Sequence, residues 1–187
     1  MTVLAIDTSA RRRIVCLRTE PDGEIVSALV EEDADVDRAL PLALASLSDG
    51  LTHVVVVVGP GSYTGVRAGM AAALGVAHAR GLPLHGAGSL DVVVAAAGAT
   101  GVDHGWALVE AGRGAAFAAR FNGGAAGQWA RVELDAFVAD DRVYSADALT
   151  VVGLHRVDPV SGLARAIPAA LARPPLRLDA LQAMYPA

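Results

Sequence analysis

A short turn near the amino terminus holds the side chains best suited to bind a phosphate group. Asp7, Thr8 and Ser9 follow an apolar run, and arginines come next. In such a turn the hydroxyls and backbone amides face the phosphate, and the carboxylate faces the accompanying metal ion. Arg11 and Arg12 would add charge-assisted hydrogen bonds to the phosphate. We therefore predict that a nucleotide, if this chain binds one, lies at these five residues; the alternative is a solvated hairpin, because the glycine usual in such a turn is missing.

A glycine-rich loop is the second place that could hold an anion. Residues 54–58 are all valine, and the loop GPGSYTG at 59–65 leads into a stretch of small residues. The glycine spacing does not fit a dinucleotide-binding loop, and the chain has no lysine for a P-loop. Free amides at the start of a following helix could still hold an anion. We favour a structural loop in which Gly59, Pro60 and Gly61 set the turn and Ser62 or Thr64 caps the helix.

Groups that could catalyse a reaction are scarce in the rest of the chain. The histidines are scattered and form no i, i+4 pair of the kind that binds metal on a helix. Cys16 lies in an apolar segment and is predicted to be an inert core thiol. The chain has no G-x-S-x-G motif for a nucleophilic serine. The residues alone therefore predict no catalytic group and no metal ligand.

The composition places limits on the class of protein. The chain has 187 residues, is 53% hydrophobic, and carries a net charge of −5. No segment reaches the ~18 uninterrupted apolar residues of a membrane span, and a single cysteine excludes an internal disulfide. An acidic chain is a poor autonomous binder of nucleic acid, since neutralised phosphates supply most non-specific affinity. We expect a cytoplasmic protein that binds no membrane.

Hydrophobic patterning predicts an α/β order of elements in the first half of the chain. Two of the predicted strands form a hairpin through the turn signal Pro21-Asp22-Gly23. The first helix follows an acidic run, with Asp35 or Asp37 as its cap and Pro41 in its first turn. The predicted strands are 3–7, 13–19, 24–31, 53–58 and 84–87, and the predicted helices are a first one beginning near 37, a second from 62 or 64 to 80, and a third from 89 or 91 to 97.

The second half begins at a glycine-rich segment, 98–105, which is the best domain boundary. We predict an amino-terminal domain at 1–100 and a smaller carboxy-terminal domain at 101–187. The predicted strands there are 106–110, 115–121, 129–133 and 151–153, and the predicted helices are 135–139, 145–149, 161–172 and 178–184.

The first two predicted helices lack an obvious polar face. Residues 39–48 carry no charge, and residues 68–77 carry no polar side chain. A helix on a protein surface should show polar residues on its outer side. Either both helices are buried within the chain or a partner covers them; the small size of the chain favours a partner. The predicted interface comprises Leu40, Leu44, Leu47, Gly69, Ala72, Ala73 and Val76.

Three blocks of sequence resemble the TsaB (YeaZ) family, bacterial proteins needed for the threonylcarbamoyladenosine modification of tRNA. The blocks are VLAIDTSA at 3–10, the long segment at 54–91 and LVEAGRGAAFAARF at 108–121. The resemblance implies an α/β fold of two ribonuclease H-like domains, as in the actin-like ATPase (ASKHA) superfamily. It is strong over residues 1–100 and thin beyond 121, and the chain is short for the family, so the second domain is expected to be reduced.

The resemblance also implies a role. TsaD, the paralogue that transfers the threonylcarbamoyl group, carries a metal-binding histidine pair whose positions correspond here to Ser89 and Val93, and neither replaces histidine. The family therefore implies a non-catalytic subunit that binds a TsaD homologue through the first two helices and supports transfer to the tRNA adenosine next to the anticodon. The ATPase TsaE and tRNA are expected only on that complex, where ATP or ADP could also bind, although this chain alone requires no cofactor. Without TsaD, we expect a homodimer through the same helices.

The chain departs from the family pattern at two places, and two alternative functions remain. The His-Ser that often opens the first helix in the family is Asp37-Arg38 here, and an Asp of the second domain is Glu110, so family contacts at those positions stay open. The alternative functions are a metal- or ATP-dependent hydrolase of the glycoprotease type and a regulator of the level of TsaD.

Overall fold

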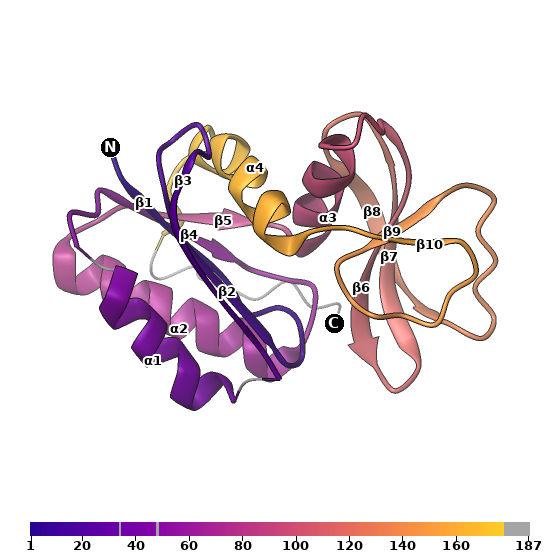
Figure 1. The fold of residues 1–187 in the computed structure, drawn as a ribbon, viewed down its shortest axis with the longest axis horizontal. Coiled ribbons are helices and arrows are strands. Elements are labelled where there is room, and N and C mark those ends of the chain that lie inside the picture. The colour runs from indigo at the N-terminus through magenta and orange to yellow at the C-terminus, as the bar shows by residue number, and fades with distance from the viewer. Residues whose placement is uncertain (34, 48, 178–187) are drawn as a thin grey trace.

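The computed structural model describes residues 1–33, 35–47 and 49–177. Within them, five strands form a first sheet in the spatial order β3-β2-β1-β4-β5 (Figure 1). β4 runs parallel to β1, and β5 parallel to β4, whereas β2 and β3 are antiparallel to their neighbours. The bounds are β1 (Val3–Asp7), β2 (Arg13–Thr19), β3 (Ile25–Glu32), β4 (His53–Val57) and β5 (Leu84–Ala87).

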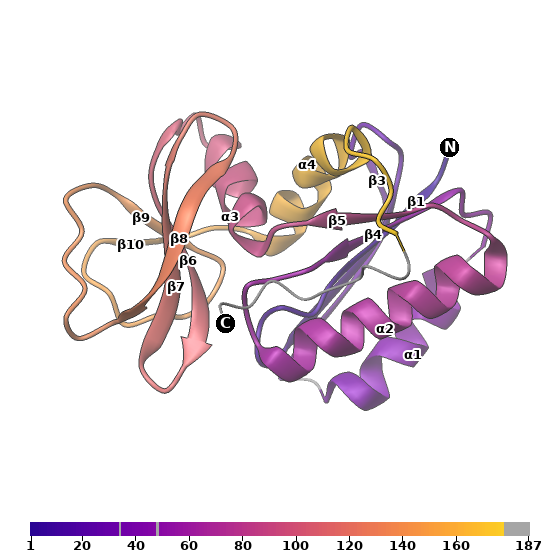
Figure 2. The same ribbon diagram turned by 180° about the vertical axis from the view of Figure 1, so that it is seen from behind.

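The central strands are apolar throughout because both faces of the sheet are covered. Leu4 and Ile6 of β1 point to one face, where α1 (Val36–Leu47) and α2 (Tyr63–Arg80) pack. Val3 and Ala5 point to the other face, which α4 (Pro159–Leu171) covers. Viewed from behind, α1 and α2 lie together on one side of the sheet and α4 on the opposite side (Figure 2). The period-two pattern of β1 thus divides its residues between two helical layers.

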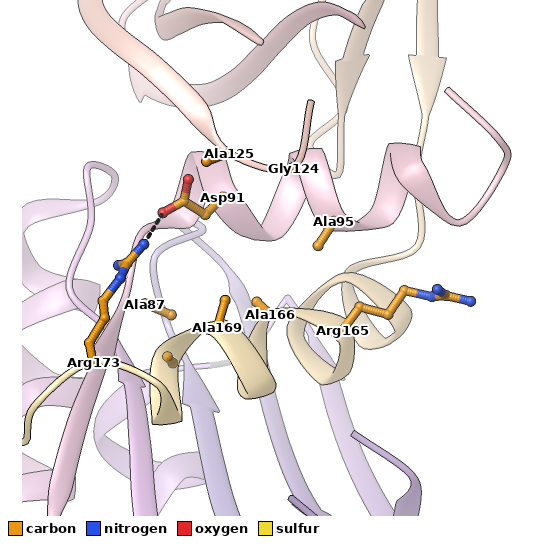
Figure 3. A pocket seen from close by; sticks show the side chains of 10 residues that line it. Ala87, Asp91, Ala95, Gly124, Ala125, Arg165, Ala166, Ala169 and Arg173 are labelled. Carbon is orange, nitrogen blue, oxygen red and sulfur yellow. Dashed lines mark ion pairs between the residues drawn. The ribbon is translucent and has the colours of Figure 1, made fainter. Parts of the chain in front are cut away.

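The second sheet has the spatial order β10-β9-β6-β7-β8. α3 (Ser89–Gly98) leads out of the first sheet and packs on the second through Leu90, Val93 and Val94. α3 and α4 lie against each other (Figure 3), and a Cβ on Gly162 of α4 would stand 2.5 Å from the carbonyl oxygen of Val92. The bounds of these strands are β6 (His104–Gly112), β7 (Ala115–Asn122), β8 (Ala126–Glu133), β9 (Val143–Ser145) and β10 (Leu154–Arg156).

The division of the chain into two domains at residue 100 stays a prediction. The two sheets lie on either side of that position, but one helix of the second half packs on the first sheet. The first sheet uses residues 3–87 and the second uses residues 104–156, on either side of that position. α4 then returns from the second half to cover the first sheet, where Leu163 and Ile167 are fully buried.

Several sequence predictions are wrong, most of them in the second half of the chain. Residues 135–139 form turns and irregular structure, and residues 145–149 begin with the last residue of β9, where a helix was predicted. The strand predicted at 151–153 lies three residues later, as β10. Pro41 stands inside α1, in its second turn, so its placement in the first turn is also wrong. The helix predicted at 178–184 lies outside the described residues.

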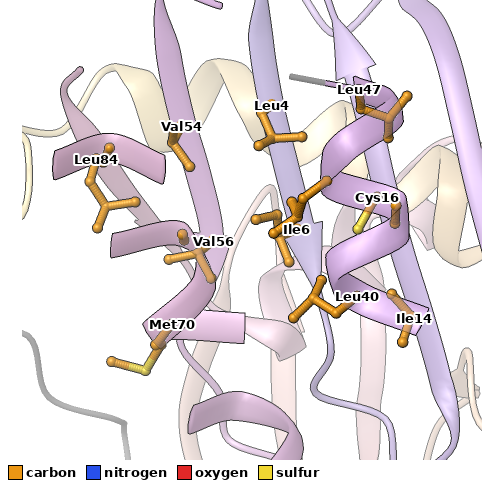
Figure 4. Close-up of a cluster of buried hydrophobic side chains, with 14 of the residues drawn as sticks. Leu4, Ile6, Ile14, Cys16, Leu40, Leu47, Val54, Val56, Met70 and Leu84 are labelled. Carbon is orange, nitrogen blue, oxygen red and sulfur yellow. The ribbon is translucent and has the colours of Figure 1, made fainter. Parts of the chain in front are cut away.

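The leucine stripe of α1 is part of the core, so its assignment to a partner surface is wrong. Leu40, Leu44 and Leu47 are at most 9% exposed. Leu40 and Leu47 point at the first sheet, toward Ile14 and Cys16 (Figure 4), and Leu44 belongs to the same core cluster. Spacing by three or four residues places all three on the helix face that the sheet covers.

Two of the predicted interface residues of α2 are buried as well. Gly69 and Ala73 face the core, so their assignment to the interface is also wrong. Ala72 and Val76 are partly exposed, and their place in an interface stays a prediction.

The glycines of α2 differ sharply in their surroundings. A Cβ on Gly65 would stand 2.1 Å from the carbonyl oxygen of Thr8, and one on Gly69 would stand 2.2 Å from the Thr8 hydroxyl. A Cβ on Gly75 would meet nothing within 4 Å. The first two glycines therefore allow the helix to approach β1, whereas nothing in the described chain requires the third.

We expect Gly75→Ala and Gly65→Ala to have opposite effects on stability. Alanine at 75 should raise the free energy of unfolding by roughly 0.5–1 kcal/mol, because it restricts the unfolded chain and favours the helix. Alanine at 65 should lower it by about 1–3 kcal/mol, because the methyl group overpacks the contact with Thr8. Urea unfolding of both variants measures the difference. Equal stabilities would contradict the close packing of α2 on the turn after β1.

Candidate functional site

The turn after β1 is buried and satisfied by its own groups. Asp7, Thr8 and Ser9 are each at most 6% exposed. The Asp7 carboxylate accepts hydrogen bonds from the Ser9 amide at 2.8 Å and from the Ser9 hydroxyl at 2.6 Å. The Thr8 hydroxyl donates to the carbonyl of Gly65 at 2.7 Å. Both hydroxyls that could face a phosphate therefore have partners within the chain: that of Thr8 holds α2 against the turn, and that of Ser9 bonds to Asp7.

The glycine loop closes over this turn. The Ser62 amide donates to the carbonyl of Ser9 at 2.7 Å, and a Cβ on Gly61 would stand 2.5 Å from the same oxygen. The Ser62 hydroxyl caps α2 by accepting from the Gly65 amide at 3.3 Å. Gly59 and Pro60 lead into the loop from β4 and are buried, and Thr64 is exposed in the first turn of the helix. The geometry is that of a structural loop and helix cap.

Little space remains beside the turn for a nucleotide. A cavity of about 60 Å³ lies among Thr8, Arg11, Arg12 and Thr64, whereas sites for small molecules occupy about 300–1,000 Å³. Arg11 is exposed, and Arg12 pairs with Asp33 at 3.1 Å. A nucleotide at this turn stays a prediction.

A buried ion pair joins the two sheets next to the turn. Arg13 of β2 approaches the Asp147 carboxylate at 3.1 Å and donates to the carbonyl of Ala146 at 3.0 Å. The two side chains are only 10% and 7% exposed. Asp147 also accepts from the Glu110 amide at 2.8 Å, so it links β6 to the first sheet. Asp147 could not be found from the sequence, because Arg13 and Asp147 are 134 positions apart and carry no local signal of their contact.

The Asp7 carboxyl lies in the same neighbourhood. Burial raises its pKa above the usual 3.8, although its hydrogen bonds to Ser9 and the charge of Arg13 act in the opposite direction. Burial also raises the pKa of the Cys16 thiol to about 12, so this cysteine carries little thiolate at neutral pH. Burial thus favours the neutral form of both the Asp7 carboxyl and the Cys16 thiol.

The positions that correspond to the TsaD histidines are used for packing. The Ser89 hydroxyl donates to the carbonyl of Pro60, and its amide donates to the carbonyl of Gly59 at 3.0 Å. Val93 is buried in the core between α3 and the second sheet. Among the residues that the structure describes, no three His, Cys, Asp or Glu side chains are grouped as they would be around a metal ion.

A second cavity, of about 90 Å³, lies between α3 and α4 (Figure 3). Alanines form its floor, and Asp91 and Arg173 stand at one end, 3.9 Å apart. Asp91 also accepts from the Ala126 amide at 3.0 Å. Both polar groups are thus engaged within the chain, and the cavity has room for only a few water molecules.

Two such α/β sheets, each with helices packed on it, define the ribonuclease H-like fold of the actin-like ATPase superfamily. YeaZ from Pseudomonas aeruginosa has this fold, with a TM-score of 0.72 at 18% identity, covering 98% of this chain and 99% of that one. The family model described as "TsaD: tRNA N6-adenosine threonylcarbamoyltransferase" matches residues 36–143. The chain belongs to this family, and its similarities are to the TsaB (YeaZ) members.

Curated relatives match about half of the chain. The tRNA threonylcarbamoyladenosine biosynthesis protein TsaB of Bacillus subtilis is 35% identical over 103 residues, which are 51% of this chain and 44% of that protein. An uncharacterized protein of Mycobacterium tuberculosis is 40% identical over 100 residues, 49% of this chain and 47% of that protein. The chain spans about half the length of the curated relatives it matches. Within the described residues, no helix is both long enough and apolar enough to cross a membrane.

We expect Asp7→Asn to stabilise the protein at pH 7 and to lose this advantage near pH 4. The folded-state pKa of Asp7 is raised, so its carboxylate costs folding free energy once the pH exceeds the unfolded value of 3.8. The cost grows until the pH passes the folded-state pKa, and asparagine removes it while keeping an oxygen that accepts from Ser9. Thermal unfolding at pH 4 and pH 7 measures the effect.

The matched control for this prediction is Asp103→Asn. Asp103 is exposed, and its hydrogen bond with His104 lowers its pKa, so the control should show no gain at pH 7. A lower melting temperature for Asp7→Asn at pH 7 would contradict the prediction.

Proposed function

We propose that this chain is a non-catalytic subunit that binds a TsaD homologue and supports threonylcarbamoyl transfer to the tRNA adenosine next to the anticodon. Membership of the TsaD family, which is associated with this tRNA modification, supports the pathway. The outer surface of α1 and α2 supports the role as a partner.

The observation that carries the proposal is a surface of small and apolar residues on these two helices. It is called here the outer helix surface, and it comprises Pro41, Ala45, Ala71, Ala72, Gly75 and Val76, all exposed or partly exposed. Ala72 and Val76 also pack against the edge of the core, whereas Pro41, Ala45, Ala71 and Gly75 are exposed. Gly75 has open space around it, although alanine would favour the helix there by about 1 kcal/mol. A second helix packed closely on α2 would use that space.

The identity of two residues supports a role without catalysis. Ser89 and Val93 stand where the catalytic paralogue has histidines, and both are engaged in the packing of α3. A serine that donates to Pro60 and a valine in the core offer no pair of ligands to a reacting group. TsaE and tRNA would then join the complex of the two subunits, and ATP or ADP would bind there.

We expect Ala71→Arg and Ala72→Arg to weaken binding to a TsaD homologue at least tenfold. Overpacking of a close contact costs about 1–3 kcal/mol, and a tenfold change corresponds to about 1.4 kcal/mol. Isothermal calorimetry with the purified partner measures affinity, and circular dichroism checks that each variant folds. The same variants should be monomeric if the chain alone dimerises through these helices.

Ala169→Arg serves as the matched control, because Ala169 is an exposed alanine on α4, across the sheet from the outer helix surface. It should bind the partner normally. Unchanged affinity in both α2 variants, with the fold intact, would rule out α2 as the contact.

We expect the pure chain to turn over neither ATP nor threonylcarbamoyl-adenylate, and to raise tRNA modification by a TsaD homologue when added to it. Assays with magnesium, zinc or iron test the first part, and a reconstituted modification assay tests the second. Turnover by the chain alone of about 1 per second, an ordinary enzymatic rate, would favour the hydrolase. Binding to TsaD without any effect on modification would favour a regulator.

A further inference from the structure

A hollow on the first sheet lies between its edge strand and α1. It has a volume of about 400 Å³, larger than the other two cavities described above. Its apolar walls come from Leu29 of β3 and from Ala39, Leu42 and Ala43 of α1. Leu42 is 72% exposed, although it is the largest apolar side chain on the outward half of the helix. Nothing in the described chain covers this hollow.

The strand beside the hollow has an open edge. β3 pairs with β2 on one side only, because it ends the strand order of the sheet. Its eight residues include Ile25, Val26 and Val30, which are 41%, 54% and 40% exposed. Open edges of this length, with apolar side chains, pair readily with another chain.

The charge of the hollow is strongly one-sided. Four carboxylates line it, from Glu31, Glu32, Asp33 and Asp35, against the single guanidinium of Arg38. Asp33 pairs with Arg12, and Asp35 accepts from the Asp37 amide at 3.2 Å. No ion pair within the described residues engages Glu31 or Glu32.

Charged residues on an edge strand also serve to prevent pairing. The carboxylates are nevertheless unevenly placed: they gather at the end of β3 that borders the hollow, whereas Glu24 alone directly flanks Ile25 and Val26 at the other end. An apolar hollow with an acidic rim beside an open backbone edge offers three complementary features to one ligand: apolar contact, charge and main-chain hydrogen bonds.

We propose that β3 and this hollow bind an extended segment of a partner protein that alternates apolar residues with arginine or lysine. The segment adds to β3 as a further strand. Successive side chains of such a strand point to opposite faces of the sheet. Its apolar groups therefore contact Leu42 on the α1 side, and its cations face the opposite side, where Glu32 lies, while Glu31 adds negative charge on the α1 side. The proposal concerns the sheet edge, and it would stand even if the outer helix surface bound nothing.

The probe for the test is a fluorescein-labelled nine-residue peptide of alternating arginine and valine, measured by fluorescence anisotropy with the full chain. We expect saturable binding, and slower hydrogen exchange of the β3 amides when the peptide is present. A peptide of alternating arginine and proline has the same charge but cannot donate main-chain hydrogen bonds at proline, so it should bind at least about tenfold more weakly. A peptide of alternating glutamate and valine should not bind.

Two double variants locate the site. Glu31→Lys with Glu32→Lys should weaken binding of the arginine–valine peptide about tenfold or more, because it reverses the charge of the rim. Glu133→Lys with Asp135→Lys makes the same change in net charge at exposed positions by the second sheet and should leave the affinity unchanged.

Four results would overturn the proposal: no binding of the arginine–valine peptide, equal weakening by both double variants, equal affinity for the arginine–proline peptide, or unchanged exchange of the β3 amides. Protection of β3 by self-association in the absence of peptide, seen by sedimentation, would assign the edge to a second copy of this chain instead.

Discussion

The contact between the turn after β1 and the first turns of α2 is the constraint on which the rest of the structure depends. The Thr8 hydroxyl reaches the Gly65 carbonyl, and two helix glycines leave no room for a methyl group against Thr8. This contact fixes the height of α2 over the central strands, and α1 packs beside it on the same face. It also engages the Thr8 hydroxyl, one of the groups that could otherwise face a phosphate. One close packing contact therefore both builds the helical layer and restricts the chemistry of the turn.

In the first half of the chain, most of the secondary structure could be predicted from local sequence patterns. The strands at 3–7, 13–19 and 84–87 have the bounds that their apolar patterns predicted, because each lies between strong turn or loop signals. In the second half the predicted helix at 145–149 is wrong: its first residue ends β9, which pairs with β6 on one side and β10 on the other. A three-residue strand stabilised by its neighbours has no periodicity of its own, so tertiary pairing overrides local preference there.

The candidate site also depends on contacts between residues far apart in the sequence, which local patterns do not predict. Asp7, Thr8 and Ser9 could be identified from their types, but whether they face solvent depends on a loop more than fifty residues later in the chain. The spacing of the α1 leucines places them on one helix face, but it does not show whether the sheet or a partner covers that face, so they were misassigned. Leu40, Leu44 and Leu47 belong to the core, so they are not available to a partner. The outer helix surface, which includes the exposed alanines and Gly75, is the part of α1 and α2 that a partner could contact.

The return of α4 to the first sheet has a consequence for how the protein is made. Val3 and Ala5 leave the ribosome long before the helix that covers their face, which ends at Leu171. With synthesis at about 5–20 residues per second, that apolar face stays open for roughly ten seconds or more. The amino-terminal half thus cannot complete its core as a nascent chain, and these contacts between distant parts of the chain favour slow folding. Chaperones that shield nascent chains would find their target on the α4 side of β1, β2 and β4.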